Sequence, residues 1–293
     1  MIAVPGAELY TEKAGDGPAL LLISGGGGDA GMYERIVPLL ARTYTVLSYD
    51  RRGNSRSRLA EPATDIGPAQ QAADAVAVLD HYGIDRAYVF GSSGGGIITM
   101  ELVTHHGRRL LGAVAHEPPL IQVLAADSPE RREFERLHQL ADQRSPLRAY
   151  AAFGAMILDD PPWVFRSPAG QTAVAGGSRA LLAIGGLARR VTGREPDAMT
   201  RQLGNADLLM LREMPTFLFE YQPDLAALAA SPVPWRLATG RDSVGRPYHR
   251  PAHVLAQRLG VPVVEFPGGH TLYVERPEEF VATLLPILAE LQR

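Results

Sequence analysis

The stretch Tyr88-Val89-Phe90-Gly91-Ser92-Ser93-Gly94-Gly95-Gly96-Ile97-Ile98 places a Gly-x-Ser-x-Gly pattern between an apolar run and a helical pattern. A strand, a sharp turn and a helix in this order predict a nucleophile elbow, which exposes the central serine above a sheet. Gly91 and Gly94 carry no Cβ and give the turn its freedom. A phosphate loop or a flexible connection competes with this interpretation. The phosphate loop needs Gly-Lys-Ser/Thr, which is absent, so the stretch favours Ser93 as a nucleophile.

Short apolar runs and helical patterns alternate on both sides of the elbow. Runs bounded by Gly, Pro or Asp are typical of strands buried on both faces, as in a parallel sheet. The runs lie at 19–23, 44–49, 87–90, 110–115, 235–238 and 261–266, and the helical patterns at 33–41, 69–82, 97–106, 250–259 and 277–291. The alternation predicts the α/β class, with a mostly parallel central sheet flanked by helices.

The region from about 121 to 223 interrupts this alternation. It contains only helical patterns, at 129–143, 145–158, 179–190 and 196–213. We expect a helical cap at 121–220 over the carboxyl ends of the strands, where open α/β sheets bind ligands. Residues 1–120 and 221–293 would form the core domain. Gly176-Gly177 and Gly185-Gly186 suggest bends within the cap.

Composition narrows the class of protein. The chain has 293 residues, a formal net charge of −3 and no cysteine. The balance of charge argues against nucleic-acid binding, and the missing cysteines exclude disulfides and thiolate sites. We see no signal peptide and no apolar run long enough to span a membrane. The sequence therefore predicts a cytoplasmic protein that acts on a small molecule, and leaves open whether it forms a homodimer.

Among the eight histidines, His270 has the best context for a general base. It follows an apolar strand and the turn Pro267-Gly268-Gly269, shortly before a helix. A serine hydroxyl needs such a base to take its proton. His105 and His106 look like ordinary cations at a helix end. Since no HExxH array occurs, we expect neither a metal nor a cofactor.

The loop Ser24-Gly25-Gly26-Gly27-Gly28 follows the first long apolar run. Acyl transfer needs backbone N–H groups aimed at the developing oxyanion. We expect Gly94, directly after the nucleophile, and Gly26 to supply them. The spacing of Gly26, Gly28 and Gly31 also matches a dinucleotide loop, but no convincing ribose-binding acid follows.

Together these features resemble the α/β-hydrolase superfamily over nearly the whole chain. The resemblance includes the glycine loop, the turn at 50–57, the elbow, the insertion and the late His270. It implies an α/β-hydrolase fold in which Asp50 orders its turn. The family's oxyanion loop usually begins His-Gly, and Ser24 replaces that histidine here.

The acid of the triad has two candidates. Most of the superfamily carries it in a Gly-x-x-Asp pattern after the penultimate strand, where this chain has Ser243 and, one residue early, Asp242. Glu117, in His116-Glu117-Pro118-Pro119, follows the strand after the nucleophile helix. That feature resembles the zearalenone lactonase-like branch, in which the acid is a glutamate at this place. We favour Glu117, with Asp242 as the alternative.

A serine at the elbow favours a carboxylic-ester hydrolase or lactonase that works through an acyl-enzyme on Ser93. Dehalogenases and epoxide hydrolases of this fold carry Asp there. A non-hydrolytic cyclase or lyase using the same pocket, or a ligand-binding protein, remains an alternative because fold does not fix function. Trp163, Met156 and Phe153 of the cap are candidate substrate-binding residues, although the same spacing is typical of packing between helices.

Overall fold

A computed structural model describes residues 1–292 and has a central sheet of seven strands, in the order β10-β9-β8-β7-β4-β5-β3. The strands are β3 (Thr11–Ala14), β4 (Ala19–Ile23), β5 (Thr45–Tyr49), β7 (Ala87–Ser92), β8 (Leu110–His116), β9 (Trp235–Gly240) and β10 (Val263–Phe266). The edge strand β3 runs antiparallel to β5, and the other neighbouring strands are parallel. The predicted α/β class with a mostly parallel sheet is confirmed.

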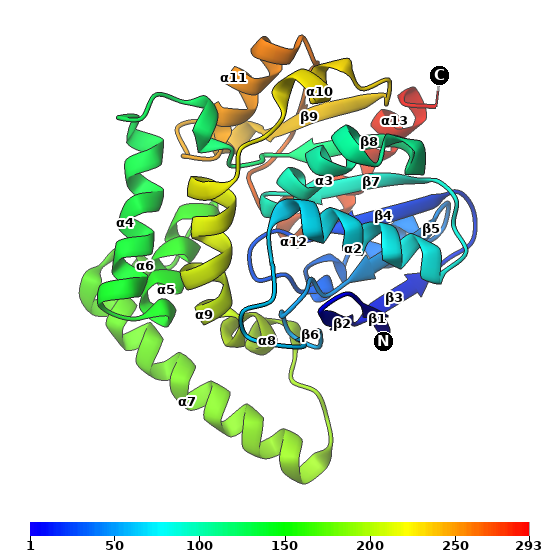
Figure 1. Cartoon of the computed structure of the whole chain (residues 1–293). Helices are drawn as coiled ribbons and strands as arrows, with labels where there is room; N and C mark the ends of the chain where they lie inside the picture. Colours follow the sequence, from blue (N-terminus) through cyan, green and yellow to red (C-terminus); the bar gives the residue numbers. More distant parts are fainter. Residues whose placement is uncertain (293) are drawn as a thin grey trace.

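A second, small sheet lies near the amino terminus, in blue in Figure 1. Its strands are β1 (Ile2–Val4), β2 (Ala7–Leu9) and β6 (Arg58–Leu59). The pairs β1–β2 and β2–β6 are antiparallel. The sequence analysis missed these strands and β3, because segments of two to four residues carry too little periodicity to be recognised.

Helices cover both faces of the central sheet and bury two apolar layers. Along β4, Leu21 and Ile23 belong to the core on one face, with α2 and α3, while Leu20 and Leu22 belong to the core on the other, with α13. Strand side chains alternate between faces, so an unbroken apolar run is what two covered faces require. The core helices are α1 (Val37–Leu40), α2 (Pro68–His81), α3 (Gly94–His105), α10 (Leu225–Ala230), α11 (His249–Leu259), α12 (Leu272–Glu275) and α13 (Pro277–Glu290), with short 3₁₀ turns η1 (Ala30–Tyr33), η2 (Gly107–Arg109), η3 (Ile121–Val123) and η6 (Arg241–Ser243).

A group of helices interrupts the chain between β8 and β9, which are neighbours in the sheet. It comprises α4 (Pro129–Gln143), α5 (Pro146–Ile157), α6 (Trp163–Arg166), α7 (Pro168–Thr192), α8 (Ala198–Gly204), α9 (Ala206–Leu208), η4 (Leu209–Glu213) and η5 (Thr216–Glu220). These helices gather at one side of the sheet (Figure 1). They fall within the residues expected as the cap, and we call them the cap below. Arg293, at the end of the expected core domain, lies outside the described residues.

Two details of the cap differ from expectation. Gly176-Gly177 and Gly185-Gly186 lie inside the continuous 25-residue helix α7 rather than at bends. The segments η4 and η5 are π-helical and flank Pro215. Proline lacks an N–H, and a π-turn accommodates that loss inside a helix. No helix in residues 1–292 has the length and apolar character needed to cross a membrane.

Candidate active site

Ser93 occupies a strained turn between β7 and α3. Its φ of 54° and ψ of −120° lie in a region that residues other than glycine rarely adopt. A Cβ on Gly91 would come within 2.1 Å of Gly95 O, and one on Gly95 within 2.1 Å of Ile23 O. The close approach of α3 to the sheet therefore requires glycine at both positions. The Ser93 N–H donates to His116 O at 2.8 Å, which ties the turn to the end of β8.

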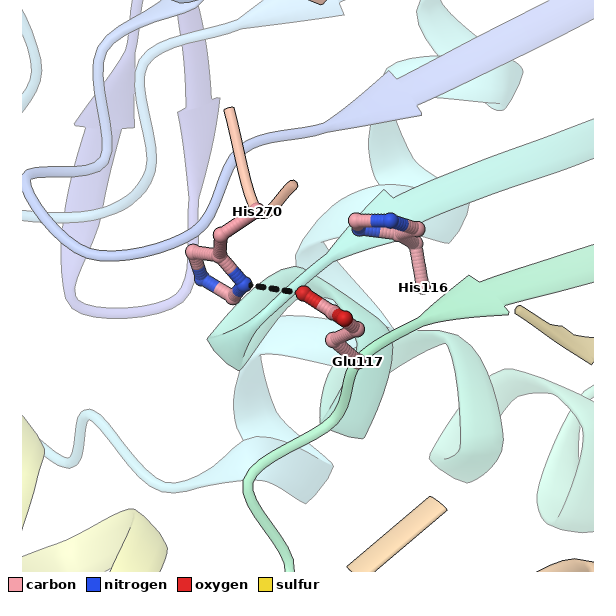
Figure 2. Close-up of side chains that lie close together, drawn as sticks. All are labelled: His116, Glu117 and His270. Carbon is pink, nitrogen blue, oxygen red and sulfur yellow. Dashed lines mark hydrogen bonds and ion pairs between the residues drawn. The ribbon is translucent and has the colours of Figure 1, made fainter. Parts of the chain in front are cut away.

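His270 and Glu117 meet beside this turn, although 153 residues separate them in the sequence (Figure 2). The distance from His270 Nδ1 to Glu117 Oε2 is 2.7 Å. The second carboxylate oxygen, Oε1, accepts the Gly240 N–H at 2.8 Å. Both side chains are buried. The carboxylate therefore bridges the end of β9 and the imidazole.

The environment keeps Glu117 ionised. Burial alone would raise its pKa, but His116, His270 and the Gly240 N–H favour the charged form and lower the pKa to about 2. An ionised carboxylate only accepts hydrogen bonds, so His270 Nδ1 carries the proton in the pair. The other ring nitrogen, Nε2, is then free to act as a base.

Asp242, the alternative acid, lies away from this pair. Its side chain is 50% exposed and forms an ion pair with Arg276 at 3.2 Å. The neighbouring Ser243 is buried, and its hydroxyl has no hydrogen-bond partner among the described residues. The structure therefore brings Glu117, and not Asp242, to His270.

The Tyr248 ring packs against the His270 ring. The two ring centroids lie 4.0 Å apart with an interplanar angle of 35°. The Tyr248 hydroxyl donates to Met156 O at 3.3 Å, which connects the stacked pair to α5 of the cap. Tyr248 was not predicted from the sequence because no local motif marks it.

His116, Glu117 and His270 form the one cluster in residues 1–292 whose donor atoms lie close enough together to hold a metal ion. Both Glu117 oxygens are already used by Gly240 and His270. Burial lowers the pKa of His116 to about 4, so this side chain is neutral near pH 7. The arrangement suits a hydrogen-bonded acid–base pair of Glu117 and His270 with His116 close by (Figure 2).

A small cavity of about 40 Å³ opens at Ser93 and is lined by Gly26, Gly94, Arg51 and apolar cap residues. Among the described residues, the N–H groups of Gly26 and Gly94 donate to no acceptor. A Cβ on Gly25 would come within 2.8 Å of Ser93 Cβ, so only glycine lets this loop lie against the elbow. The two predicted oxyanion donors therefore flank Ser93 at the cavity.

The three predicted substrate-binding residues have different surroundings. Phe153 lines the small cavity and also a larger one of about 460 Å³ between the cap and the core. Met156 is buried in the core and lines neither cavity. Trp163 is 76% exposed and also lines neither cavity. Helical spacing could not distinguish a side chain that packs inward from one that faces solvent.

Arg51 and Glu213 form a buried ion pair that sequence reasoning missed. Arg51 follows β5, and Glu213 ends η4, 162 residues later. Two hydrogen bonds of 2.8 Å join the guanidinium to the two carboxylate oxygens. Both residues line the small cavity. The Asp50-Arg51-Arg52 sequence marked a turn but gave no sign of a partner in the cap.

The sequence and fold were compared with known proteins. Residues 20–283 match the model of the Alpha/beta hydrolase family. The uncharacterized hydrolase YraK of Bacillus subtilis strain 168 is 31% identical over 292 residues, which cover 98% of this chain and 94% of the relative. A zearalenone hydrolase of Cladophialophora bantiana is 30% identical over 162 residues, 54% of this chain and 58% of that one. The enol-lactonase of Burkholderia xenovorans LB400 has a similar fold, with a TM-score of 0.67 and 20% identity over 98% of this chain and 99% of that one.

Proposed function

Because this chain belongs to the alpha/beta hydrolase family, we propose that it is a serine hydrolase that cleaves a carboxylic ester or lactone through an acyl-enzyme on Ser93. The observation that carries the proposal is the position of Ser93, strained at φ 54° beside the Gly26 and Gly94 N–H groups, which have no acceptor within residues 1–292. Backbone strain of this kind concentrates where a side chain must be held for chemistry. The buried Glu117–His270 pair beside it supplies a base.

Each residue has a defined role in the proposed reaction. His270 Nε2 takes the proton of Ser93 Oγ, which attacks the carbonyl carbon, and the Gly26 and Gly94 N–H groups hold the oxyanion. The C–O bond then breaks, and His270 returns the proton to the leaving alcohol. Water, deprotonated by the same nitrogen, attacks the acyl carbon. The bond to Ser93 Oγ then breaks, His270 returns the proton to Oγ, and the acid is released. Glu117 holds the imidazole and stabilises its charged form throughout.

Ser93 Oγ and His270 Nε2 share no hydrogen bond within residues 1–292. Contacts around the pair support the proposal instead, because the Ser93 N–H is bonded to His116 O and the next residue, Glu117, holds His270. In enzymes without substrate, catalytic hydrogen bonds are often long and tighten when substrate binds. The proposed proton transfer therefore requires the two side chains to approach each other when substrate binds.

The two cavities suggest how a substrate would lie. The small one is sized for the reacting carbonyl, and the larger one, lined mainly by apolar side chains such as Leu147, Ile157 and Phe165, suits an apolar remainder of the substrate. Phe153 lines both and would separate the two parts. A relative named as a zearalenone hydrolase is consistent with lactones as one substrate type.

The test is hydrolysis of a short nitrophenyl ester and a macrolactone by the wild type and by Ser93→Ala, with folding checked by circular dichroism. We expect Ser93→Ala to lose at least about 10⁴-fold in kcat, and a fluorophosphonate to label the wild type alone. Turnover that survives Ser93→Ala would refute the acyl-enzyme. Tight binding of the lactone without any turnover would indicate a binding protein instead.

A further inference from the structure

The glycine loop, defined here as residues 25–28, is held on the cap side by two polar contacts that flank Gly26. Resting on the proposed function, we propose that Glu213, acting through Arg51, and Asn205 are positioning residues that orient the Gly26 N–H. Through these contacts, the packing of the cap on the core would determine how strongly the oxyanion hole binds the oxyanion.

The first contact is a hydrogen bond from Arg51 Nη2 to Gly25 O at 2.8 Å. In a trans peptide the C=O and the N–H point in opposite directions, and the chain has no cis peptide bond in residues 1–292. Holding Gly25 O toward Arg51 therefore turns the N–H of the same peptide unit, which belongs to Gly26, the opposite way. That N–H has no other partner among the described residues and borders the cavity at Ser93.

Glu213 fixes Arg51 in the orientation that makes this contact. Its carboxylate takes both terminal nitrogens of Arg51, and Oε1 also accepts Asn54 Nδ2 at 3.0 Å. Gln71 completes the set by accepting Arg51 Nη1 at 2.7 Å. The pair is almost fully buried, so water does not screen it, and removal of one partner leaves the other as an uncompensated charge. Arg51 would then reorganise and lose its hydrogen bond to Gly25 O, which the Gly28 N–H also holds at 3.1 Å.

The second contact comes from Asn205, between α8 and α9. Its Nδ2 donates to Gly27 O at 2.6 Å and to Ser55 Oγ at 2.8 Å, while its Oδ1 accepts the Ser55 N–H at 2.8 Å. One carbonyl on each side of Gly26 is thus held by a group that belongs to the cap or is fixed by it. Gly27 has a φ of 84°, and glycine backbone moves easily between conformations, so the loop depends on such contacts for a fixed shape.

The chain contains a matched control. Arg52, next to Arg51, forms an equally buried ion pair with Asp74 at 2.6 Å. Its remaining hydrogen bonds go to Asp65 O and Pro5 O, and within residues 1–292 none of its side-chain hydrogen bonds reaches the glycine loop. Asp74→Asn and Arg52→Lys therefore disturb a buried ion pair without touching the loop. They are compared with Glu213→Gln and Arg51→Lys.

The experiment measures kcat and KM on a short nitrophenyl ester, the inhibition constant of a small trifluoromethyl ketone, and the melting temperature. The ketone forms a tetrahedral adduct whose oxyanion needs the Gly26 N–H, whereas KM for a small ester depends on it little. Removing an oxyanion donor costs about 10²–10³ in kcat, so misorienting one by Glu213→Gln or Arg51→Lys should cost about 10- to 100-fold. Ketone affinity should fall by the same factor and KM should change little.

Asn205→Ala, at a less buried site, should lower kcat and ketone affinity several-fold and leave KM nearly unchanged. This variant tests the inference if Glu213→Gln does not fold. The controls Asp74→Asn and Arg52→Lys should lower the melting temperature as much while kcat and ketone affinity hold. Equal losses in the two sets of variants, or a change in KM alone, would overturn the inference and leave the hydrolase intact. A wild type that cleaves no ester and binds no ketone would overturn both proposals.

Discussion

Each of two neighbouring strands, β8 and β9, is followed by an acidic residue that is a candidate partner of His270. The surroundings of the two carboxylates differ. Glu117, after β8, is buried and lies 2.7 Å from His270 Nδ1. Asp242, after β9, is half exposed and faces Arg276. A position after a parallel strand is therefore not sufficient. The chain must also turn the side chain inward and give the carboxylate hydrogen-bond donors.

Local backbone explains the difference. Glu117 has a φ of 44°, one of three residues other than glycine at positive φ in residues 1–292, and its N–H donates to Ala238 O at 2.8 Å. This turn directs the side chain across the end of β9, where the Gly240 N–H receives it. Asp242 instead sits in the 3₁₀ turn η6, with its own N–H bonded to Gly268 O at 3.2 Å. The strained residue is the one placed at the site.

The sharpest test of this comparison is Glu117→Gln beside Asp242→Asn. A neutral amide no longer stabilises the imidazolium and can favour the wrong tautomer of His270, so kcat should fall about 10³- to 10⁴-fold. Asp242→Asn removes only a half-exposed ion pair and should change kcat by less than about 2-fold. Steady-state kinetics on a nitrophenyl ester decides. The reverse order of effects would return the acid to the end of β9.

The pH dependence of stability tests whether Glu117 is held in its charged form. Glu117 has a pKa of about 2 in the folded protein against an ordinary value of 4.5. A lowered carboxyl pKa contributes stability that is fully present above 4.5 and is lost as the pH falls from 4.5 toward 2, at about 1.4 kcal/mol per pH unit. Over the whole window this amounts to about 3 kcal/mol.

Urea unfolding between pH 7 and 3 measures this contribution. Glu117→Gln has no carboxyl to protonate, so its free energy of unfolding should fall less steeply below pH 4.5 than that of the wild type. Parallel curves for the wild type and Glu117→Gln would mean that Glu117 is not held in its charged form.

Much of the fold was predictable, because its signals are long and local. The continuous apolar runs at 19–23 and 87–90 correspond to β4 and β7, since strands buried on both faces have no polar side to break the run. The short strands β1, β2 and β6 and the length of α7 were not predictable. The short strands depend on pairing partners elsewhere, and α7 tolerates glycine pairs that sequence rules associate with bends.

The candidate site was predictable where a motif carries it and not where a distant partner completes it. Ser93, Gly94 and His270 follow from local patterns beside strands. The pairing of Arg51 with Glu213 joins residues 162 apart in the sequence, and the stacking of Tyr248 on His270 has no local signature. The exposed position of Trp163 likewise depends on how α6 packs. Such features require the three-dimensional arrangement of the cap on the core.

The smallest expected effect concerns Ser243, at the place where the resemblance puts an acid. Ser243 is buried beside Gly240, and its hydroxyl has no partner within residues 1–292. If a carboxylate at the end of either strand can reach His270, the double variant Glu117→Gln with Ser243→Asp should be about 10- to 100-fold more active than Glu117→Gln alone. This gain corresponds to about 1.4–2.7 kcal/mol. Recovery stays partial because the Tyr248 stack and the Gly240 N–H are arranged for the native acid. Glu117→Gln with Ser243→Asn is the matched control and should recover nothing. Equal activity in the two double variants would show that the end of β9 cannot present an acid to His270. The position of the acid after β8 would then be determined by the fold and not only by the residue type.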